Sequence, residues 1–410
     1  MKSRICATLL AGVTGLCSAA LAAEPLTLEA AVDRAVAAAP EVRAGQASVE
    51  SARGAITQAG VRPNPTVGIQ AEDFAGSGPF NGLNQSQVTL TYEQRIERGG
   101  KRDARLAYAA RGLDLAEAQA RQRRLDLAAG VQRAFIDVQI ADQLVWIAER
   151  RLETERALQT EALRRVRGYR DPLFVETQTE ARVTTAELAL QQARARAAAA
   201  RALLASFWGG DGNGLEVSEG IEKPSGTPPV LASADAAVRD AAVAEASAGV
   251  VLEQSRARQD YTVGGGLRLL RETNDVALVA SVSIPLGRFD RNQGNIAQAQ
   301  AERQRLEAEA EADRLARLRR LAQLRAEANA AEAQADGLMH QVYPKAVRTL
   351  EQVREGYNRG GFRFSDVQTA ADEIIAVQQQ WAEAMNAYRD AQTEIDRLTG
   401  RFDVAAETLP

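Results

Sequence analysis

Cysteine and histidine are scarce in this chain of 410 residues. The two cysteines, Cys6 and Cys17, lie close to the N-terminus, and His340 is the single histidine. The rest of the chain therefore has neither a disulfide nor a thiol for redox chemistry or metal binding. A lone histidine does not make a metal centre, and no Ser/His/Asp set or carboxylate pair stands out. We therefore expect no enzymatic activity, no cofactor and no metal site.

Long hydrophobic runs and an excess of basic charge are also lacking. Beyond the N-terminal segment, no stretch approaches the roughly 20 apolar residues of a membrane helix. If the chain crosses a membrane, it must therefore do so with β-strands. Lys and Arg total 50 against 54 Asp and Glu, which argues against a nucleic acid partner. Aromatic residues make up only 5%, and the abundant alanine favours long, closely packed helices.

The N-terminal segment, residues 1–22, is typical of a secretory signal peptide. Lys2 and Arg4 precede an apolar stretch, and small residues near its end fit a cleavage site. A transmembrane anchor is a weaker interpretation because the apolar run is short and interrupted. A lipoprotein signal would use Cys17, but Leu16 stands where a small residue is expected. We therefore expect the mature protein to leave the cytoplasm without a lipid anchor.

Residues 23–208 form the first of two predicted structural units. The unit begins with a helix that Pro40 should kink or divide. A β-hairpin at about 65–95 follows, in which apolar and polar residues alternate. A long helical hairpin then covers about 100–208, and its first helix would extend on the order of 100 Å. An ordinary coiled-coil pair is the alternative interpretation of these long helices.

The same order of elements follows a linker, or equatorial segment, at residues 209–230. A second unit, residues 231–402, again has a helix, a β-hairpin at about 261–286 and a long helical hairpin at about 292–400. Residues 403–410 form a C-terminal tail. The stretch RVRGYRDPLFVETQTEA in the first unit resembles QVREGYNRGGFRFSDVQTAA in the second. We therefore predict a duplicated helix–strand–strand–helix–helix unit.

The four predicted strands have the length and alternation of transmembrane β-strands. Four strands leave open edges, which hydrocarbon does not tolerate. Closure therefore requires further copies of the chain, and three copies would contribute about twelve strands. The predicted fold class is mainly α with transmembrane β, in which a trimeric 12-stranded β-barrel continues as a long α-helical barrel. A small soluble antiparallel sheet with attached helices is the alternative.

Two strand-to-helix corners carry a resemblance to a known family. RIERGGKRDAR resembles the E-L-G-G-K-R corner of the heavy-metal, CzcC-like branch of the TolC-type outer-membrane efflux family. SIPLGRFDRNQGNIAQAQ resembles the same branch's P-L-x-x-F-D-R-N-Q-G-N motif. The resemblance covers nearly all of residues 24–402, and Arg98 departs from it where leucine is usual. The corner residues are Gly99, Gly100, Lys101, Arg102, Phe289, Asp290, Arg291, Asn292, Gln293 and Gly294.

This resemblance implies a homotrimeric channel in the outer membrane that extends into the periplasm. Its partners would be outer-membrane lipid, a periplasmic adaptor (membrane fusion) protein and an inner-membrane pump of the resistance-nodulation-division class. The implied function is passive export of divalent heavy-metal cations. Two alternatives are the same duct exporting drugs or other organic compounds, and a periplasmic adaptor or scaffold protein.

The resemblance also implies a periplasmic constriction held by inward-facing acidic residues after the turn of the second helical hairpin. Asp366 occupies the first such position, and Thr369 replaces the second acid. Three copies of Asp366 would repel one another unless a cation or basic neighbours bind them, and Arg359 and Arg363 are the candidate neighbours. Alternatively, Asp366 is only a first-turn acid that stabilises the helix N-terminus.

Both helical hairpins carry a Gly-Tyr sequence near their expected tips. These tip residues are Gly168, Tyr169, Gly356, Tyr357 and Asn358. A glycine beside a small polar residue permits a tight reversal of the chain. The resemblance implies that the tips are docking surfaces for adaptor hairpins, while the alternative is turn chemistry alone.

The basic side chains at the first corner occupy positions that are unfavourable for positive charge. Lys101, Arg102 and Arg105 lie in the first turns of a helix, where the helix dipole opposes positive charge. We expect that these cations bind membrane headgroups or acidic neighbours. The acidic candidates are Glu93, Glu97 and Asp103. Gly99 and Gly100 supply the backbone freedom for the change from strand to helix.

Overall fold

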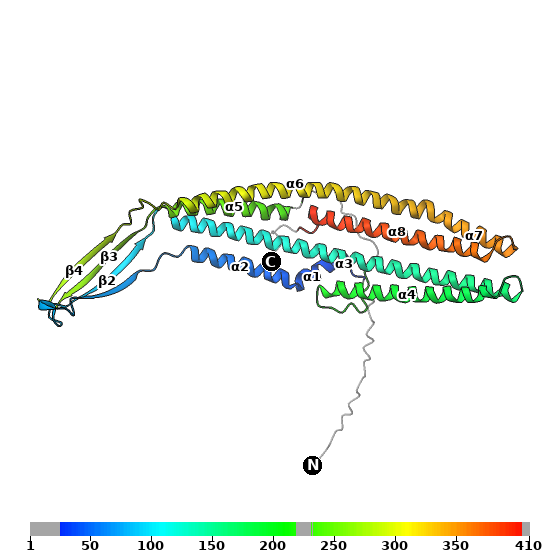
Figure 1. Ribbon diagram of the computed structural model, residues 1–410, viewed down its shortest axis with the longest axis horizontal. Coiled ribbons are helices and arrows are strands. Elements are labelled where there is room, and N and C mark those ends of the chain that lie inside the picture. Colours follow the sequence, from blue (N-terminus) through cyan, green and yellow to red (C-terminus); the bar gives the residue numbers. More distant parts are fainter. Residues whose placement is uncertain (1–24, 219–230, 232, 404–410) are drawn as a thin grey trace, which may run out of the picture.

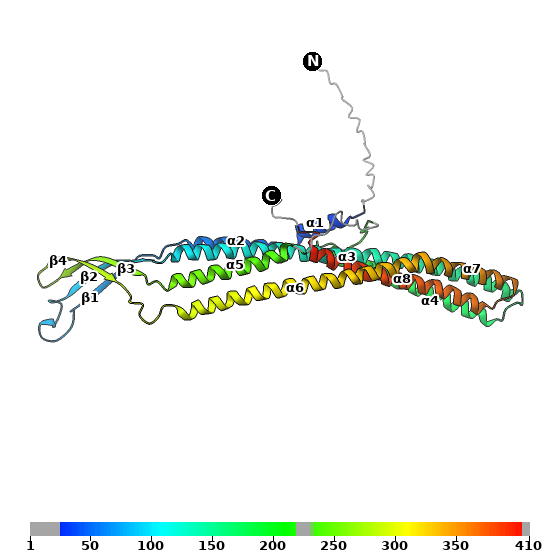
Figure 2. The same ribbon diagram turned by 90° about the horizontal axis from the view of Figure 1, so that it is seen from above.

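The computed structural model of the protein describes residues 25–218, 231 and 233–403. The protein is a long, narrow rod with a small β-sheet at one end and helices over the remaining length (Figure 1). Viewed at 90° to this direction, the rod is again long and narrow (Figure 2). The predicted signal peptide, most of the predicted linker and residues 404–410 lie outside the described residues.

The first half of the chain follows the predicted order of elements. It consists of α1 (Leu28–Ala38), α2 (Pro40–Ala59), β1 (Thr66–Glu72), a short 3-10 turn (Gly78–Phe80), β2 (Gln87–Ile96), α3 (Lys101–Arg167) and α4 (Phe174–Ser206). Thr27 caps α1, since its Oγ1 accepts the N–H of Ala30 at 3.2 Å. Pro40 begins α2 as a separate helix, which confirms the expected division. With 67 residues, α3 extends about 100 Å.

The second half contains one interruption that the sequence analysis did not predict. Its elements are α5 (Ser233–Arg256), β3 (Tyr261–Leu270), β4 (Asp275–Ser283), α6 (Gln293–Gly337), a π turn (Leu338–Val342), α7 (Tyr343–Arg359) and α8 (Phe364–Thr399). The long helix expected after residue 292 is therefore divided into α6 and α7. Pro344 has no N–H, and its ring clashes with the carbonyl of His340 in a regular α-helix. The π turn, with its wider spacing, accommodates this proline.

The four strands form one antiparallel sheet in the order β1-β2-β3-β4. The two predicted hairpins are confirmed, and β2 joins them by pairing with β3 from Gln87↔Leu270 to Ile96↔Tyr261. Strands β1 and β4 are the edges of the sheet. Each of these edges carries backbone groups that pair with no strand of the described chain.

The register brings the apolar residues of all four strands onto one face. From β1 to β4, the apolar rows are Ala71, Val88, Leu269 and Val276; Ile69, Leu90, Leu267 and Leu278; and Val67, Tyr92, Gly265 and Ala280. All these residues are exposed in the single chain. The opposite face carries mainly threonine, glutamine, glycine, serine and charged residues, and its apolar members are Leu270, Ala277 and Val279. The predicted alternation of an apolar and a polar face is therefore confirmed.

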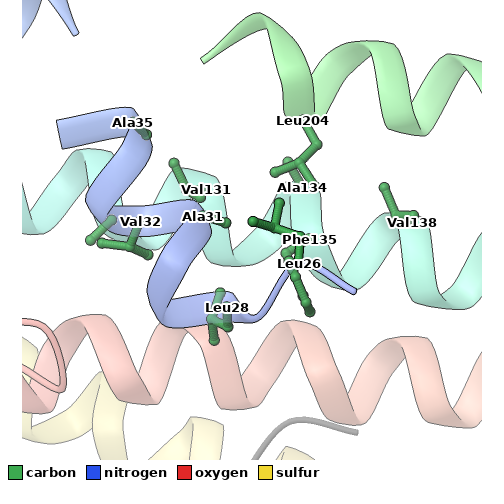
Figure 3. Packing of buried hydrophobic residues seen from close by; sticks show 11 residues of the cluster. Leu26, Leu28, Ala31, Val32, Ala35, Val131, Ala134, Phe135, Val138 and Leu204 are labelled. Carbon is green, nitrogen blue, oxygen red and sulfur yellow. The ribbon is translucent and has the colours of Figure 1, made fainter. Parts of the chain in front are cut away.

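A hydrophobic cluster attaches α1 to the middle of the rod (Figure 3). Its fully buried members come from α1, α3 and α4, and the largest of them is Phe135. Each buried Val, Leu or Phe contributes about 1.5–3 kcal/mol relative to an exposed position. The labelled residues are Leu26, Leu28, Ala31, Val32, Ala35, Val131, Ala134, Phe135, Val138 and Leu204. This cluster holds α3 as the central helix of the first half.

Within the described residues, no helix is both long enough and apolar enough to cross a membrane.

Candidate functional site

Far from the sheet, the α3–α4 and α7–α8 hairpins end side by side (Figure 1). A hydrophobic cluster joins the two ends, and its buried members are Leu158, Ala162, Val166, Val175, Tyr357, Phe364, Val367 and Ala371. The rings of Tyr357 and Phe364 lie 5.7 Å apart between their centroids. Separating the hairpins would expose this apolar surface to water.

A polar link crosses the same junction and is built on Arg165 of α3. Its guanidinium donates to the Asp171 carboxylate, at 2.9 Å from Nε to Oδ2, and to the Tyr357 carbonyl oxygen at 2.6 Å. The guanidinium also lies 4.1 Å from the centre of the Tyr357 ring. The Tyr357 hydroxyl donates to Asp171. We refer to Arg165, Asp171 and Tyr357 as the tip link, which connects the two hairpins.

The tip link keeps each member in its hydrogen-bonding charge state. Burial raises the pKa of Asp171, but hydrogen bonds from Arg165 and Tyr357 outweigh burial, and the net pKa is lowered. Burial, followed by the hydrogen bond to Asp171, raises the pKa of the Tyr357 hydroxyl. The hydrogen bond to Asp171 raises the pKa of Arg165. At neutral pH a carboxylate is therefore bound by a cation and a neutral phenol.

Two further ion pairs connect the hairpins between the tip and the middle of the rod. Arg354 of α7 contacts Glu161 of α3 at 3.0 Å. Arg182 of α4 binds Glu155 of α3, at 2.8 Å from Nη2 to Oε1, and also Asp372 of α8. Hydrogen bonds to these two carboxylates raise the pKa of Arg182. The second hairpin is thus held to the first at three levels.

Asp366 lies in the first turn of α8, where its Oδ2 accepts the N–H of Arg363 at 2.9 Å. Its interpretation as a first-turn acid is therefore confirmed. Within the single chain, Arg359 pairs with Glu355, and Arg363 contributes its backbone N–H to Asp366. Asp366 is exposed in the single chain.

The two Gly-Tyr sequences occupy different positions at the tips. Gly168 ends α3, and Tyr169 adopts a φ of +57° with 98% of its surface exposed. In contrast, Gly356, Tyr357 and exposed Asn358 lie inside α7. The prediction that Gly356, Tyr357 and Asn358 form the turn of the second hairpin is wrong.

The second turn instead follows at Gly360, whose φ is +83°. The Phe362 ring lies over Gly356, where a Cβ would come within 2.1 Å of Phe362 Cδ2. Gly356 is therefore needed for this close contact and not for a reversal of the chain.

At the first strand-to-helix corner, two consecutive glycines have left-handed backbones. Gly99 has a φ of +72° and Gly100 a φ of +71°. A Cβ on Gly99 would also lie 2.5 Å from Cγ of Arg258, whereas nothing lies within 4 Å of a Cβ on Gly100. Gly99 is therefore required both for its conformation and for close packing against the segment after α5.

The cations of this corner all have partners within the chain. Lys101 Nζ lies 2.7 Å from Asp260, and Arg102 Nε donates to the Gly60 carbonyl at 2.7 Å. Arg105 binds Glu97, as predicted, and the hydrogen bond to Glu97 raises its pKa. The Gly60 carbonyl belongs to the C-terminus of α2, which favours positive charge. The unfavourable position on α3 is thus offset by a favourable one on α2.

Arg98 fits the corner through an aromatic partner. Its guanidinium lies 4.3 Å from the centre of the Tyr261 ring and donates to the Tyr261 hydroxyl. Its backbone N–H donates to Asp260 at 3.2 Å. The side chain therefore packs on β3, where a leucine would offer apolar contact only.

The second corner uses asparagine where the first uses glycine. Asn292 has a φ of +59°, its N–H donates to Asp290 at 2.8 Å, and its Nδ2 donates to the Glu253 carbonyl oxygen at 2.8 Å. The Gln293 side chain accepts the N–H of Arg291 at 2.9 Å. Phe289 and Gly294 are exposed. The motif therefore fixes the start of α6 against α5.

Among the described residues, no group of three or more His, Cys, Asp or Glu side chains is placed to hold a metal ion. His340 of the π turn contacts Asp336 of α6 at 2.9 Å, and both side chains are exposed. Arg165, Asp171 and Arg182 were not identified from the sequence. Their contacts with Asp171 and Glu155 lie within the α3–α4 hairpin, but their contacts with Tyr357 and Asp372 cross to the other hairpin, and no local pattern marks those.

Residues 31–210 and 232–401 match the family described as outer membrane efflux protein. The chain belongs to this family. The cobalt-zinc-cadmium resistance protein CzcC of Cupriavidus metallidurans is 31% identical over 390 residues, which cover 93% of this chain and 91% of CzcC. The nickel-cobalt-cadmium resistance protein NccC of Alcaligenes xylosoxydans xylosoxydans is 26% identical over 316 residues, 76% of this chain and 69% of NccC.

Solved outer-membrane channels have the same fold. OprN has a TM-score of 0.76 at 18% identity, covering 91% of this chain and 89% of OprN. VceC from Vibrio cholerae has a TM-score of 0.72 at 19% identity, covering 91% of this chain and 96% of VceC. The expected resemblance to TolC-type channels is confirmed. This efflux protein is an outer-membrane protein that extends into the periplasm, and it is not an enzyme.

Proposed function

We propose that three copies of this efflux protein form a passive exit duct across the outer membrane. The observation that carries this proposal is the four-stranded sheet, with one largely exposed apolar face and two unpaired edges. Hydrocarbon does not tolerate open strand edges, so the sheets of neighbouring copies pair at β1 and β4. Three copies give a 12-stranded barrel, and the long helices continue it as a tube through the periplasm.

In this proposal the chain is divided as its sequence suggests. Residues 1–22 are a signal peptide, residues 23–208 and 231–402 are duplicated units, residues 209–230 link them, and residues 403–410 form a tail. The two separate matches to one family, over residues 31–210 and 232–401, support the duplication. Each unit supplies one strand pair and one helical hairpin.

The proposed cargo is divalent heavy-metal cations. CzcC and NccC are named for resistance to cobalt, zinc, nickel and cadmium, and the corner motifs of this chain resemble that branch. The same duct exporting drugs or other organic compounds is the alternative, because the fold serves channels in general. Membership in the efflux family sets aside the alternative of an adaptor or scaffold.

The proposed partners are a periplasmic adaptor and an inner-membrane pump of the resistance-nodulation-division class, which supplies the energy. We propose that the adaptor docks on the α3–α4 tip. Tyr169, Leu173 and Phe174 are all well exposed there, and exposed apolar side chains favour protein contacts. Buried Tyr357 does not contribute to this surface, although Gly168 and Asn358 border it.

The tip link is the proposed latch of the periplasmic end. Opening moves the end of α7–α8 away from α3–α4, which breaks the contacts of Arg165 and Asp171 with Tyr357. The π turn between α6 and α7 provides a place to bend, as such interruptions often do. Three copies of Asp366, with Arg359 and Arg363 nearby, form the acidic constriction of the closed tube.

Reconstitution tests the duct. Purified protein should run as a trimer after cross-linking and give discrete conductance steps in planar bilayers. A protein that remains monomeric and never conducts would contradict the proposal.

Deletion of the gene tests the cargo. Loss of the protein should sensitise cells to cobalt, zinc, nickel or cadmium and leave sensitivity to hydrophobic drugs unchanged. The reverse pattern would favour organic cargo.

A further inference from the structure

One long basic side chain, Arg268 of β3, lies on the polar face of the sheet. The register places it between Thr89 of β2 and Ala277 of β4. Its Nε donates to Thr89 Oγ1 at 3.1 Å, and its Nη1 donates to Gln87 Oε1 at 3.5 Å. Its Nη2 lies 3.7 Å from Oε2 of Glu72 on β1. The guanidinium thus lies along the sheet and reaches across three strands.

Glycines lie on one side of this arginine on the same face. Gly68 and Gly266 lie in the row next to it, and Gly264 lies one row further on. A Cβ on Gly266 would lie 2.3 Å from the Leu90 carbonyl oxygen, and one on Gly264 would lie 2.5 Å from Ser281 Oγ. Close packing therefore excludes side chains at these positions. On its own strand, Arg268 therefore has no side chain beside it on the side of Gly266 and Gly264.

Negative charge prevails on this face. Its charged residues are Glu72, Glu93, Arg95, Arg268 and Asp275. The carboxylates therefore outnumber the arginines. A water-filled passage lined by this face favours cations, and an unpaired Arg268 would oppose that preference.

We propose that Glu72 and Arg268 determine the ion selectivity of the outer part of the duct. This inference rests on the proposed trimeric duct, in which the polar face lines the lumen. Glu72 neutralises Arg268 and holds its guanidinium against the wall, so that three copies of this arginine do not repel divalent cations. Thr89 and Gln87 are positioning residues that bind the same guanidinium.

A purely structural role would give a different result on substitution. If the pair only fixed the register of β1, β2 and β3, removing either partner would weaken the trimer and leave selectivity unchanged. If the pair controls the field in the lumen, the two single substitutions act in opposite directions. Removal of both partners then restores the original charge balance.

The test is the reversal potential of single trimers in planar bilayers under a KCl gradient, and then under a CaCl2 gradient. Glu72→Gln should lower the cation-to-anion permeability ratio about twofold or more, and Arg268→Gln should raise it. The double variant should lie near the wild type. Arg271→Gln removes the same charge just outside the strands and should change the ratio less than Arg268→Gln.

Salt dependence provides a second readout. The shifts should be largest at about 0.1 M salt, where the Debye length is about 10 Å, and should shrink at about 1 M, where it is about 3 Å. Thermal stability of the trimer identifies a variant that is merely misfolded. If Glu72→Gln is misfolded, Arg268→Gln and Glu72→Asp still decide the question. Glu72→Asp should retain the wild-type ratio.

Equal cation-to-anion permeability ratios for Glu72→Gln, Arg268→Gln and wild type, or shifts in the same direction, would overturn this inference. Such a result would not contradict the proposed duct. A wild-type protein that forms no channel would instead remove the proposed duct, and the inference with it.

Discussion

Tyr169 and Tyr357 each follow a glycine near the far end of a long helix, but 98% of Tyr169 is exposed and only 1% of Tyr357. Tyr169 adopts a left-handed backbone outside α3, whereas Tyr357 lies in the last turns of α7 against Phe364 and Arg165. The two tyrosines therefore suit different roles. Tyr169 is available to a partner, and Tyr357 joins the two helical hairpins.

The variant Tyr357→Phe should loosen the closed end of the tube. It removes the hydroxyl that donates to Asp171 and leaves the ring in the hydrophobic cluster. A hydrogen bond to a charged group contributes about 1.5–3 kcal/mol, so the closed conformation should lose population. We expect a higher single-channel conductance in bilayers than for the wild type. Tyr169→Phe is the matched control and should conduct like the wild type.

Asp171 should make the same latch sensitive to acid. Its pKa in the folded chain is lowered, so its contribution to stability is fully present above its ordinary pKa of 3.8. That contribution is lost as the pH falls through the lowered value. Tyr357, with a raised pKa, remains a hydrogen-bond donor above its ordinary value of 10.0.

Conductance measured from about pH 7 down to about pH 3 checks this expectation, and wild-type conductance should rise at the acid end. Asp171→Asn should already conduct more at neutral pH and should respond less to acid. If wild type and variant respond equally, another carboxylate controls the tip.

Local patterns predicted the elements of this fold well. The alternation around Tyr92 and Leu267 fixed the apolar face, and Pro40 marked a helix boundary, because strand period and proline geometry act within a few residues. The π turn was not predicted, although Pro344 lies directly after it. A proline can end, kink or widen a helix, and sequence alone does not distinguish these outcomes.

Contacts between distant segments could not be predicted in the same way. Lys101 was expected to need an anionic partner, but the partner is Asp260, which is 159 residues away. Arg165 meets Tyr357 only because the two hairpins lie side by side. A single sequence contains the charge of each residue but not the register between helices.

The substitution Gly99→Ala should prevent assembly. Alanine at a φ of +72° is strained by about 1–2 kcal/mol, and its Cβ would clash with Arg258. Gly100→Ala carries the same backbone strain without a clash, so it isolates the steric part. We expect the Gly99 variant to yield little heat-resistant oligomer in outer-membrane fractions, and the Gly100 variant to yield more. Equal yields would show that the contact with Arg258 is dispensable.

The variant Arg182→Gln should destabilise the junction of the two hairpins. It leaves Glu155, only 3% exposed, without its bidentate cation. Breaking a buried ion pair by removing one partner costs about 3–5 kcal/mol. Asp372→Asn is the control, since it removes only the more exposed partner of Arg182. Thermal unfolding followed by circular dichroism should show a larger drop in Tm for Arg182→Gln, and a reversed order would contradict this account.

Asp366 has a structural role in the first turn of α8 and a proposed role in the acidic constriction, and two substitutions separate these roles. Glutamine at this position retains a side chain that can accept the N–H of Arg363, whereas alanine removes both the acceptor and the charge. If three copies of Asp366 line the constriction, Asp366→Gln and Asp366→Ala should both raise conductance and reduce block by divalent cations. If Asp366 only stabilises the helix N-terminus, the loss of its charge alone should have no effect on the passage of ions. Asp366→Gln should then keep wild-type conductance and cation block, and only Asp366→Ala should differ.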